Sequence, residues 1–125
     1  MTRGIRGATT ISENKADMII ENTRQLIEEM VTKNNVEPED VSHVFISVTK
    51  DLNAAFPAKA LRKLSGWTYV PVMCMAEIEV PNSLPSCIRV MMIVNTDIDQ
   101  AAIQHVFHNE AVHLRPDLAG KVEKQ

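Results

Sequence analysis

Arg89 is the residue whose type and position best suit chemistry, because it interrupts an otherwise apolar run over residues 87–97. At strand spacing, one face of this run holds Arg89 with apolar neighbours, and the other holds Ile88, Val90, Met92 and Val94. Apolar residues on both faces are typical of a strand in the middle of a covered sheet. A permanent cation is costly to bury there unless an anion meets it. Arg89 is therefore expected either to form a salt bridge with a neighbouring carboxylate or to receive an anionic ligand.

The histidines and cysteines suggest little further chemistry. His105 and His108 have a spacing that can bind zinc on a helix, and His113 follows. Here the spacing crosses a helix end, and no paired cysteines accompany it. Cys74 lies among apolar neighbours without the signature of a nucleophile. We therefore expect no metal site and no nucleophilic cysteine.

Cations outnumber anions among the residues expected to face inward. Glu77 is the one acidic residue among the apolar strands, so a catalytic pair of carboxylates is missing. The cations in or beside ordered segments are Arg6, Arg89 and Arg115 near strands, and Lys59 and Arg62 on a short helix. Several cations converging with one acid would suit a small dianion that carries a hydroxyl group. The pattern predicts an anion-binding pocket and does not identify its ligand.

The elements that must position these residues are one long helix, one short helix and several strands. Helical periodicity begins at Ala16 and continues to Val31, with Ser12 or Asn14 as the expected N-cap. Pro57 is suited to open a short helix that Ser65 and Gly66 would stop. Extended segments are expected at residues 3–11, 41–49, 67–80, 87–97 and 105–108. The prediction is an α+β fold in which a mixed β-sheet packs against both helices.

Strict alternation in the extended segment 67–80 places Cys74 and Glu77 on opposite faces. If both reach one site, either a bulge intervenes or residue 74 contributes its backbone.

Composition limits the classes of protein that fit. The chain has 125 residues, of which 45% are hydrophobic and 23% charged, as expected for one globular domain. We place that domain at residues 1–115 and a flexible tail at 116–125. The net charge of −3 and the scarcity of aromatic residues argue against a nucleic-acid partner. Two cysteines in apolar runs and the lack of a signal or membrane-spanning segment indicate a reduced, cytoplasmic protein with no membrane partner.

Seven motifs together resemble one enzyme family. In chain order they are RGIRGATT, FPAKALR, LSGW, YVPVMCM followed by EI, CIRVMM, HVF and LRPDL. Motifs in this order resemble those of the monofunctional chorismate mutases of the small bacterial α/β class. The resemblance runs from about Arg3 to Leu118 and is weakest along the long helix. It implies a homotrimeric pseudo α/β-barrel with active sites at subunit interfaces. It also implies an isomerase of aromatic amino acid biosynthesis that converts chorismate to prephenate by a [3,3]-sigmatropic rearrangement.

The same resemblance assigns roles to individual residues. Arg89 would lie beside the ether oxygen of the substrate, Arg6 would contact a side-chain carboxylate, and Glu77 would meet the ring hydroxyl. These three are the expected catalytic residues. The expected substrate-binding residues are Phe56, Ala58, Lys59, Arg62, Met73, Cys74, Phe107, Leu114 and Arg115. Of these, Cys74 would act through its backbone or thiol, and Leu114 and Arg115 belong to a segment that would fold over bound ligand.

Two positions depart from the family pattern. Phe107 stands where a tyrosine is usual, so a hydroxyl contact to a carboxylate is lost. Met73 stands where a threonine is usual, so the threonine hydroxyl is missing from another polar contact. Neither residue would address the breaking bond, so we expect altered affinity and retained chemistry. The alternative is a non-catalytic trimer that binds small dianions in the same pocket, because a fold does not fix a function.

A pericyclic rearrangement agrees with the missing nucleophile and metal site. One bound molecule rearranges without proton transfer or cofactor, so the protein need only hold its compact form and stabilise charge on the ether oxygen.

Overall fold

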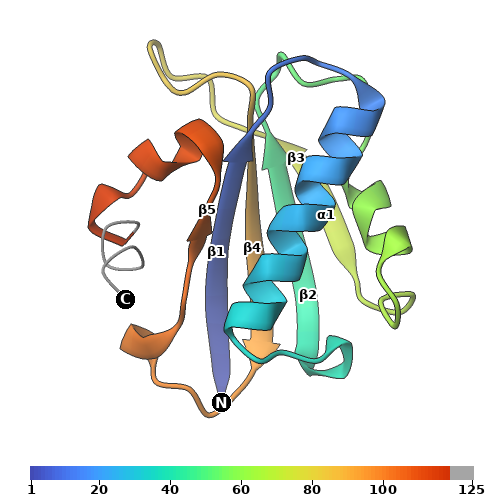
Figure 1. Cartoon of the computed structure of the whole chain (residues 1–125), viewed down its shortest axis with the longest axis vertical. Coiled ribbons are helices and arrows are strands. Elements are labelled where there is room, and N and C mark those ends of the chain that lie inside the picture. The colour runs from blue at the N-terminus through green and yellow to red at the C-terminus, as the bar shows by residue number, and fades with distance from the viewer. Residues whose placement is uncertain (119–125) are drawn as a thin grey trace.

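The computed structural model describes residues 1–118, and residues 119–125 of the expected tail lie outside the described part (Figure 1). The strands are β1 (Thr2–Thr10), β2 (Val41–Val48), β3 (Val72–Ala76), β4 (Cys87–Asn95) and β5 (Val106–Phe107). The α-helix is α1 (Ala16–Lys33). The 3-10 helices are η1 (Pro38–Asp40), η2 (Pro57–Lys63), η3 (Gln100–Ala102) and η4 (Asn109–His113). Within residues 1–118, no helix has the length and apolar character that crossing a bilayer requires.

The five strands form one mixed sheet in the order β3-β2-β4-β1-β5. The central strand is β4, which pairs antiparallel with β1 and β2. The outer strands β3 and β5 run parallel to β2 and β1 respectively. The predicted α+β fold with a mixed sheet is confirmed, and so is the central position of the strand that carries Arg89.

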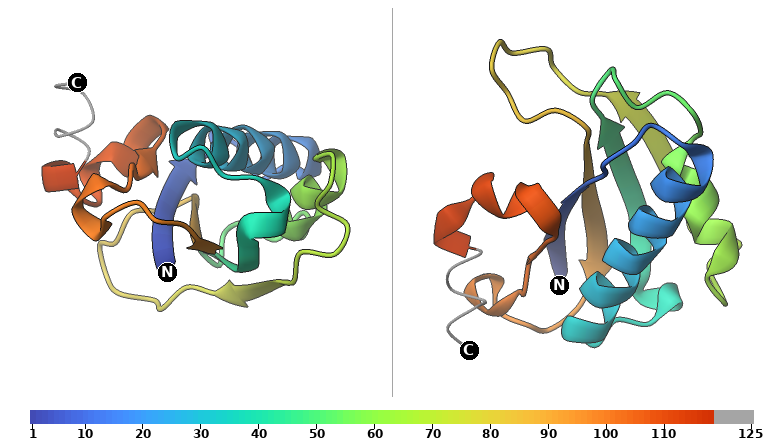
Figure 2. Two further views of the ribbon diagram at one scale, coloured as in Figure 1. Left: turned by 90° about the horizontal axis from the view of Figure 1, so that it is seen from below. Right: turned by 45° about the horizontal axis from the view of Figure 1, so that its top comes forward.

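One face of the sheet is covered by α1, and η2 lies on the same side (Figure 2). The core between these layers includes Ile19, Leu26, Ile27 and Met30 of α1 and the inward positions of β4. Those positions are Ile88, Val90, Met92 and Val94, each at most 3% exposed. Strand alternation therefore directs Arg89 and Met91 to the opposite face.

That opposite face, called here the open face, is more exposed than the sequence predicted. A sheet covered on both sides was predicted, yet Phe45, Met73, Met75 and Met91 are between 39% and 61% exposed. Apolar composition on both faces of β4 suggested full coverage, but within the described chain a helix covers only one face. The desolvation cost of Arg89 is accordingly smaller than a buried position would impose.

The N-terminus of α1 also differs from expectation. The N-cap is Lys15, and no side chain caps the helix there, so neither Ser12 nor Asn14 has the predicted role. Asn14 instead accepts hydrogen bonds from the backbone N–H groups of Asn53 and Ala54. Its side chain thus joins the loop before α1 to the loop before η2.

The short helix after Pro57 exists, but it is a 3-10 helix and not an α-helix. It ends at Lys63, and Gly66 follows with φ +86°, a backbone conformation that glycine adopts without steric cost. Pro57, Ala60 and Leu61 bury one side of η2, so its basic residues Arg62 and Lys63 face solvent.

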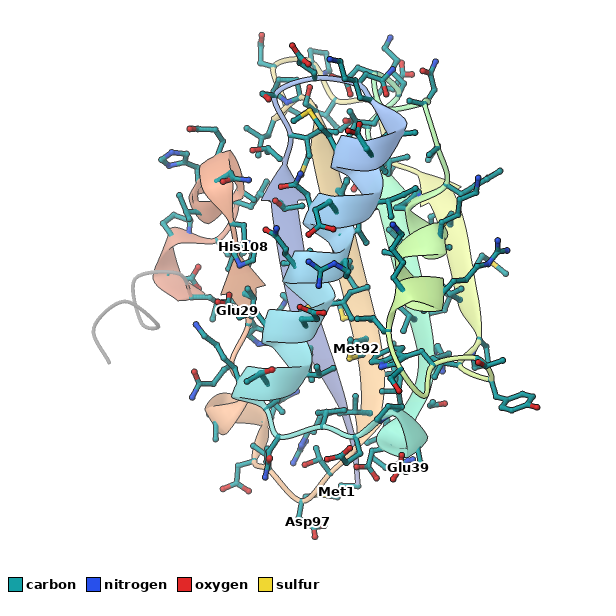
Figure 3. The ribbon with its side chains drawn as sticks, turned by 45° about the vertical axis from the view of Figure 1, so that its right-hand side comes forward. Met1, Glu29, Glu39, Met92, Asp97 and His108 are labelled. Carbon is teal, nitrogen blue, oxygen red and sulfur yellow. The ribbon has the colours of Figure 1, made fainter. Side chains whose placement is uncertain are left out.

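Two side chains, those of His108 and Asn109, hold β5 and η4 against the rest of the fold. The His108 imidazole lies 2.8 Å from a Glu29 carboxylate oxygen on α1, and Figure 3 shows the two side chains approaching each other. Asn109 donates from its amide to Thr9 Oγ1 and to the Thr10 carbonyl. These contacts set where the chain after η4 lies. Residues 116–118, predicted to open a flexible tail, are helical.

Candidate active site

A cavity of about 450 Å³ lies on the open face of the sheet and is called here the arginine cavity. Strands β1, β2 and β4 form the floor of this cavity. The end of β3 forms one wall, and the segment from β5 to residue 115 forms a second wall. Its principal lining residues are Arg6, Ala8, Phe45, Ser47, Met75, Glu77, Ile78, Arg89, Met91, Phe107, Leu114 and Arg115.

Strand register brings two arginines together in this cavity. Arg6 pairs with Met91 across the β1–β4 ladder, and Ala8 pairs with Arg89. Arg6 and Arg89 are therefore diagonal neighbours on one face, at a spacing of roughly 7–8 Å for such positions. Residues more than eighty positions apart in the sequence thus point into the same space.

Arg89 forms a two-pronged ion pair with Glu77. Its Nε lies 2.7 Å from one carboxylate oxygen of Glu77 and its Nη2 lies 2.9 Å from the other. The salt-bridge alternative for Arg89 is therefore confirmed, but the pair sits in a cavity and the Arg89 side chain remains 53% exposed. Among residues 1–118 the remaining nitrogen, Nη1, has no hydrogen-bond partner. A fixed guanidinium with a spare donor can bind an incoming oxygen atom.

Ser47 is a site residue that sequence reasoning missed. Its hydroxyl donates to Glu77 Oε2 at 2.8 Å, the same oxygen that receives Arg89 Nε. The Arg89 guanidinium, and then the Ser47 hydroxyl, hold the pKa of Glu77 below its ordinary value against the opposing effect of burial. The only feature in the sequence that could have indicated Ser47 is a hydroxyl side chain two residues after Phe45, on the same face of β2. Nothing in the sequence connected it to Glu77.

The charges that line the arginine cavity are those of Arg6, Arg89, Arg115 and Glu77, three positive and one negative, for a net charge of +2. No carboxylate pairs with Arg6 within the described chain, where its contacts are with His105. Arg115 pairs with Asp117, two residues further on. A small dianion would balance this charge.

The remaining predicted residues gather elsewhere. A second cavity of about 340 Å³, called here the edge hollow, lies between η2 and the first residues of β3. It is lined by Phe56, Ala58, Lys59, Arg62, Val72, Met73 and Cys74. The arginine cavity borders the end of β3, whereas the edge hollow borders its beginning. Within one chain the structure therefore brings the predicted residues together in two groups and not one.

Cys74 and Glu77 lie on opposite faces, as alternation predicted. Glu77 follows the end of β3, where its backbone N–H donates to the Val48 carbonyl. Cys74 is half-buried beside η2, and burial raises the pKa of its thiol. Cys87 is buried, which raises its pKa to about 11. Neither thiol has the lowered pKa of a nucleophile.

The histidines have separate partners. His105 contacts Arg6, His108 contacts Glu29, and His113 lies 3.4 Å from Glu110. Within residues 1–118, no three His, Cys, Asp or Glu side chains are grouped so that they could hold a metal ion.

Comparison with known proteins identifies related sequences and structures. The model of the family "Chorismate mutase type I" matches residues 2–118. Chorismate mutase AroH of Bacillus subtilis (strain 168) is 52% identical over 119 residues, which are 95% of this chain and 94% of that protein. Chorismate mutase AroH of Thermus thermophilus is 44% identical over 119 residues, 94% of this chain and 97% of the other. The solved structure of a chorismate mutase from Clostridium thermocellum superposes with a TM-score of 0.84 at 55% identity, covering 86% of this chain and 96% of that one.

Proposed function

Because this chain belongs to the type I chorismate mutase family and isomerises chorismate to prephenate, we propose that the arginine cavity is the centre of its active site. The reaction belongs to aromatic amino acid biosynthesis. The observation that carries the proposal is the Arg89–Glu77 pair, which holds a guanidinium in fixed orientation on the wall of an open cavity.

Arg89 supplies electrostatic stabilisation. If the C–O bond of chorismate breaks ahead of C–C bond formation, negative charge grows on the ether oxygen. The spare Nη1 donor meets that oxygen while Nε and Nη2 stay on Glu77, so the guanidinium needs no reorganisation during the reaction. Such a donor binds the transition state more strongly than the ground state, and this difference accelerates the reaction.

The cavity also restricts the substrate to its compact form. The +2 charge of the lining matches the two carboxylates of chorismate, and Arg6 binds one of them. Glu77 accepts a hydrogen bond from the ring hydroxyl through the remaining lone pair of Oε1, the oxygen that within the described chain receives only Arg89 Nη2. Phe107 and Leu114 provide apolar walls, so unproductive extended conformers are excluded. No nucleophile, proton transfer or cofactor enters these steps.

We propose further that the active sites lie between subunits of a homotrimer. The open face exposes a continuous set of large apolar side chains, and a neighbouring subunit would bury them. The two cavities flank opposite ends of edge strand β3, so the edge hollow of one subunit can complete the arginine cavity of the next. Residues of the edge hollow, including Lys59 and Arg62, then close the pocket, and Leu114 and Arg115 fold over the ligand. Free Cys74 and Cys87 favour a cytoplasmic enzyme.

The interface model is tested by mixing subunits. Arg89→Ala disables the arginine cavity, and the double variant Lys59→Ala/Arg62→Ala disables the edge hollow, so each trimer alone should consume chorismate poorly. When the two chains are co-expressed and assemble at random, about a quarter of the interface sites combine two intact halves. Activity measured by loss of chorismate absorbance should return to that level. If each subunit held a complete site of its own, mixing would restore nothing.

A further inference from the structure

His105 precedes β5 and contacts Arg6 at two points. The backbone N–H of Arg6 donates to His105 Nδ1 at 2.9 Å. The ladder between β1 and β5 has only two residue pairs, Gly7 with Val106 and Ala8 with Phe107. The imidazole therefore extends this short ladder by one hydrogen bond, in the place where a strand would offer a carbonyl. In Figure 1, β5 lies beside β1 along this stretch.

The second contact joins the side chains: His105 Nε2 lies 3.2 Å from Arg6 Nη1. A neutral imidazole has one protonated nitrogen and one acceptor. Since Nδ1 accepts the backbone N–H, the proton resides on Nε2, where it faces a guanidinium nitrogen that can only donate. This second contact is therefore not a hydrogen bond. The imidazole lies against the guanidinium without accepting from it, so Nη1 stays able to donate to another group.

From this geometry we propose that His105 is a positioning residue for Arg6. It fixes the Arg6 backbone through Nδ1 and keeps the guanidinium beside the arginine cavity in a state that an anionic substrate group can satisfy. A carboxylate at this position would instead neutralise Arg6, as Glu77 does for Arg89. The inference rests on the proposed contact between Arg6 and a substrate carboxylate.

The test uses three substitutions at position 105. His105→Asn places an amide oxygen near the position of Nδ1, so it retains the acceptor for the Arg6 N–H. His105→Gln places its oxygen nearer to Nε2, and His105→Leu removes both nitrogen atoms. Leu and Gln should lower kcat/KM roughly tenfold, mainly by raising KM, whereas Asn should restore it to within a few-fold of the original enzyme.

The same substitutions in an Arg6→Ala background identify the route of the effect. If His105 acts through Arg6, His105→Leu should change kcat/KM by less than about twofold once Arg6 is gone, because the two residues act as one unit. Equal effects in both backgrounds, or rescue by Gln and not by Asn, would overturn the inference. Full activity of Arg6→Ala alone would instead refute the proposed role of Arg6.

Discussion

Replacing Arg89 with lysine separates the geometry of the proposed catalytic cation from its charge. In the structure, two nitrogens of Arg89 span both oxygens of Glu77 at 2.7 and 2.9 Å, and the third remains available. A lysine has one nitrogen, which can pair with Glu77 or reach the ether oxygen but cannot hold a fixed position between them. The substitution therefore retains the charge and removes the pre-oriented donor.

The expected loss is that of one fixed donor to a developing anion. Removing such a donor costs about 3–4 kcal/mol in the transition state, which lowers kcat on the order of a hundredfold to a thousandfold. KM should change little, since the proposed contacts to the substrate carboxylates, that of Arg6 among them, lie elsewhere in the cavity. Position 89 lies on the open face with its side chain 53% exposed, so a lysine fits without disturbing the core.

The assay is the loss of chorismate absorbance at saturating and limiting substrate, with unfolding curves recorded for each variant. Arg24→Lys is the matched control, because Arg24 also joins carboxylates, those of Glu21 and Glu28, but lies on α1. It should leave kcat unchanged. An Arg89→Lys enzyme that turns over within a few-fold of the original would refute the assignment of Arg89 as a pre-oriented donor.

Three further predictions follow from single contacts. Ser47→Ala removes a hydrogen bond that lowers the pKa of Glu77, so the pKa of Glu77 should rise. Because the proposed mechanism uses ionised Glu77, the acid limb of the pH profile of kcat/KM should move to higher pH. An acid limb that stays in place would contradict this prediction. Phe107→Tyr adds a hydroxyl to the wall of the arginine cavity and should lower KM for chorismate by roughly tenfold, with kcat nearly unchanged. If steady-state kinetics showed no change in KM, residue 107 would not reach a substrate carboxylate. Gly7→Ala places a Cβ against the sulfur of buried Met30, and this overpacking should lower the free energy of unfolding by about 1–3 kcal/mol. Urea unfolding at fixed protein concentration measures the change. An unchanged unfolding midpoint would mean that Met30 repacks freely.

Much of the fold follows from local patterns in the sequence. Period-two alternation identified β4 and placed Arg89 on the face opposite Ile88 and Val90, but did not predict that this face is open, and period 3.6 identified α1. The cap of α1 did not follow, because Asn14 bonds to backbone groups of residues 53 and 54, which are distant in sequence. Local propensity carries no information about such a partner.

The residues of the candidate site were named from the sequence, but their arrangement was not. Family resemblance named Arg6, Glu77 and Arg89, yet only the β1–β4 register and the return of the chain after β3 bring them into one cavity. Ser47 has no distinguishing sequence signal, since its role depends on the chain after β3 returning a carboxylate to it. His105 was considered only as a metal ligand, because its contact with a backbone N–H arises from a two-residue parallel ladder that periodicity cannot reveal.

The position of Arg89 on the central strand ties activity to correct strand pairing. Neighbouring residues of β4 point to opposite sides, so sliding this strand by one residue would turn the guanidinium into the hydrocarbon layer beneath α1 and turn both Ile88 and Val90 outward. A mispaired molecule would lose the proposed catalytic cation from the arginine cavity and lose its core packing in the same event. Turnover measured during refolding would therefore count only those molecules whose ladders have aligned, even where other probes already report secondary structure.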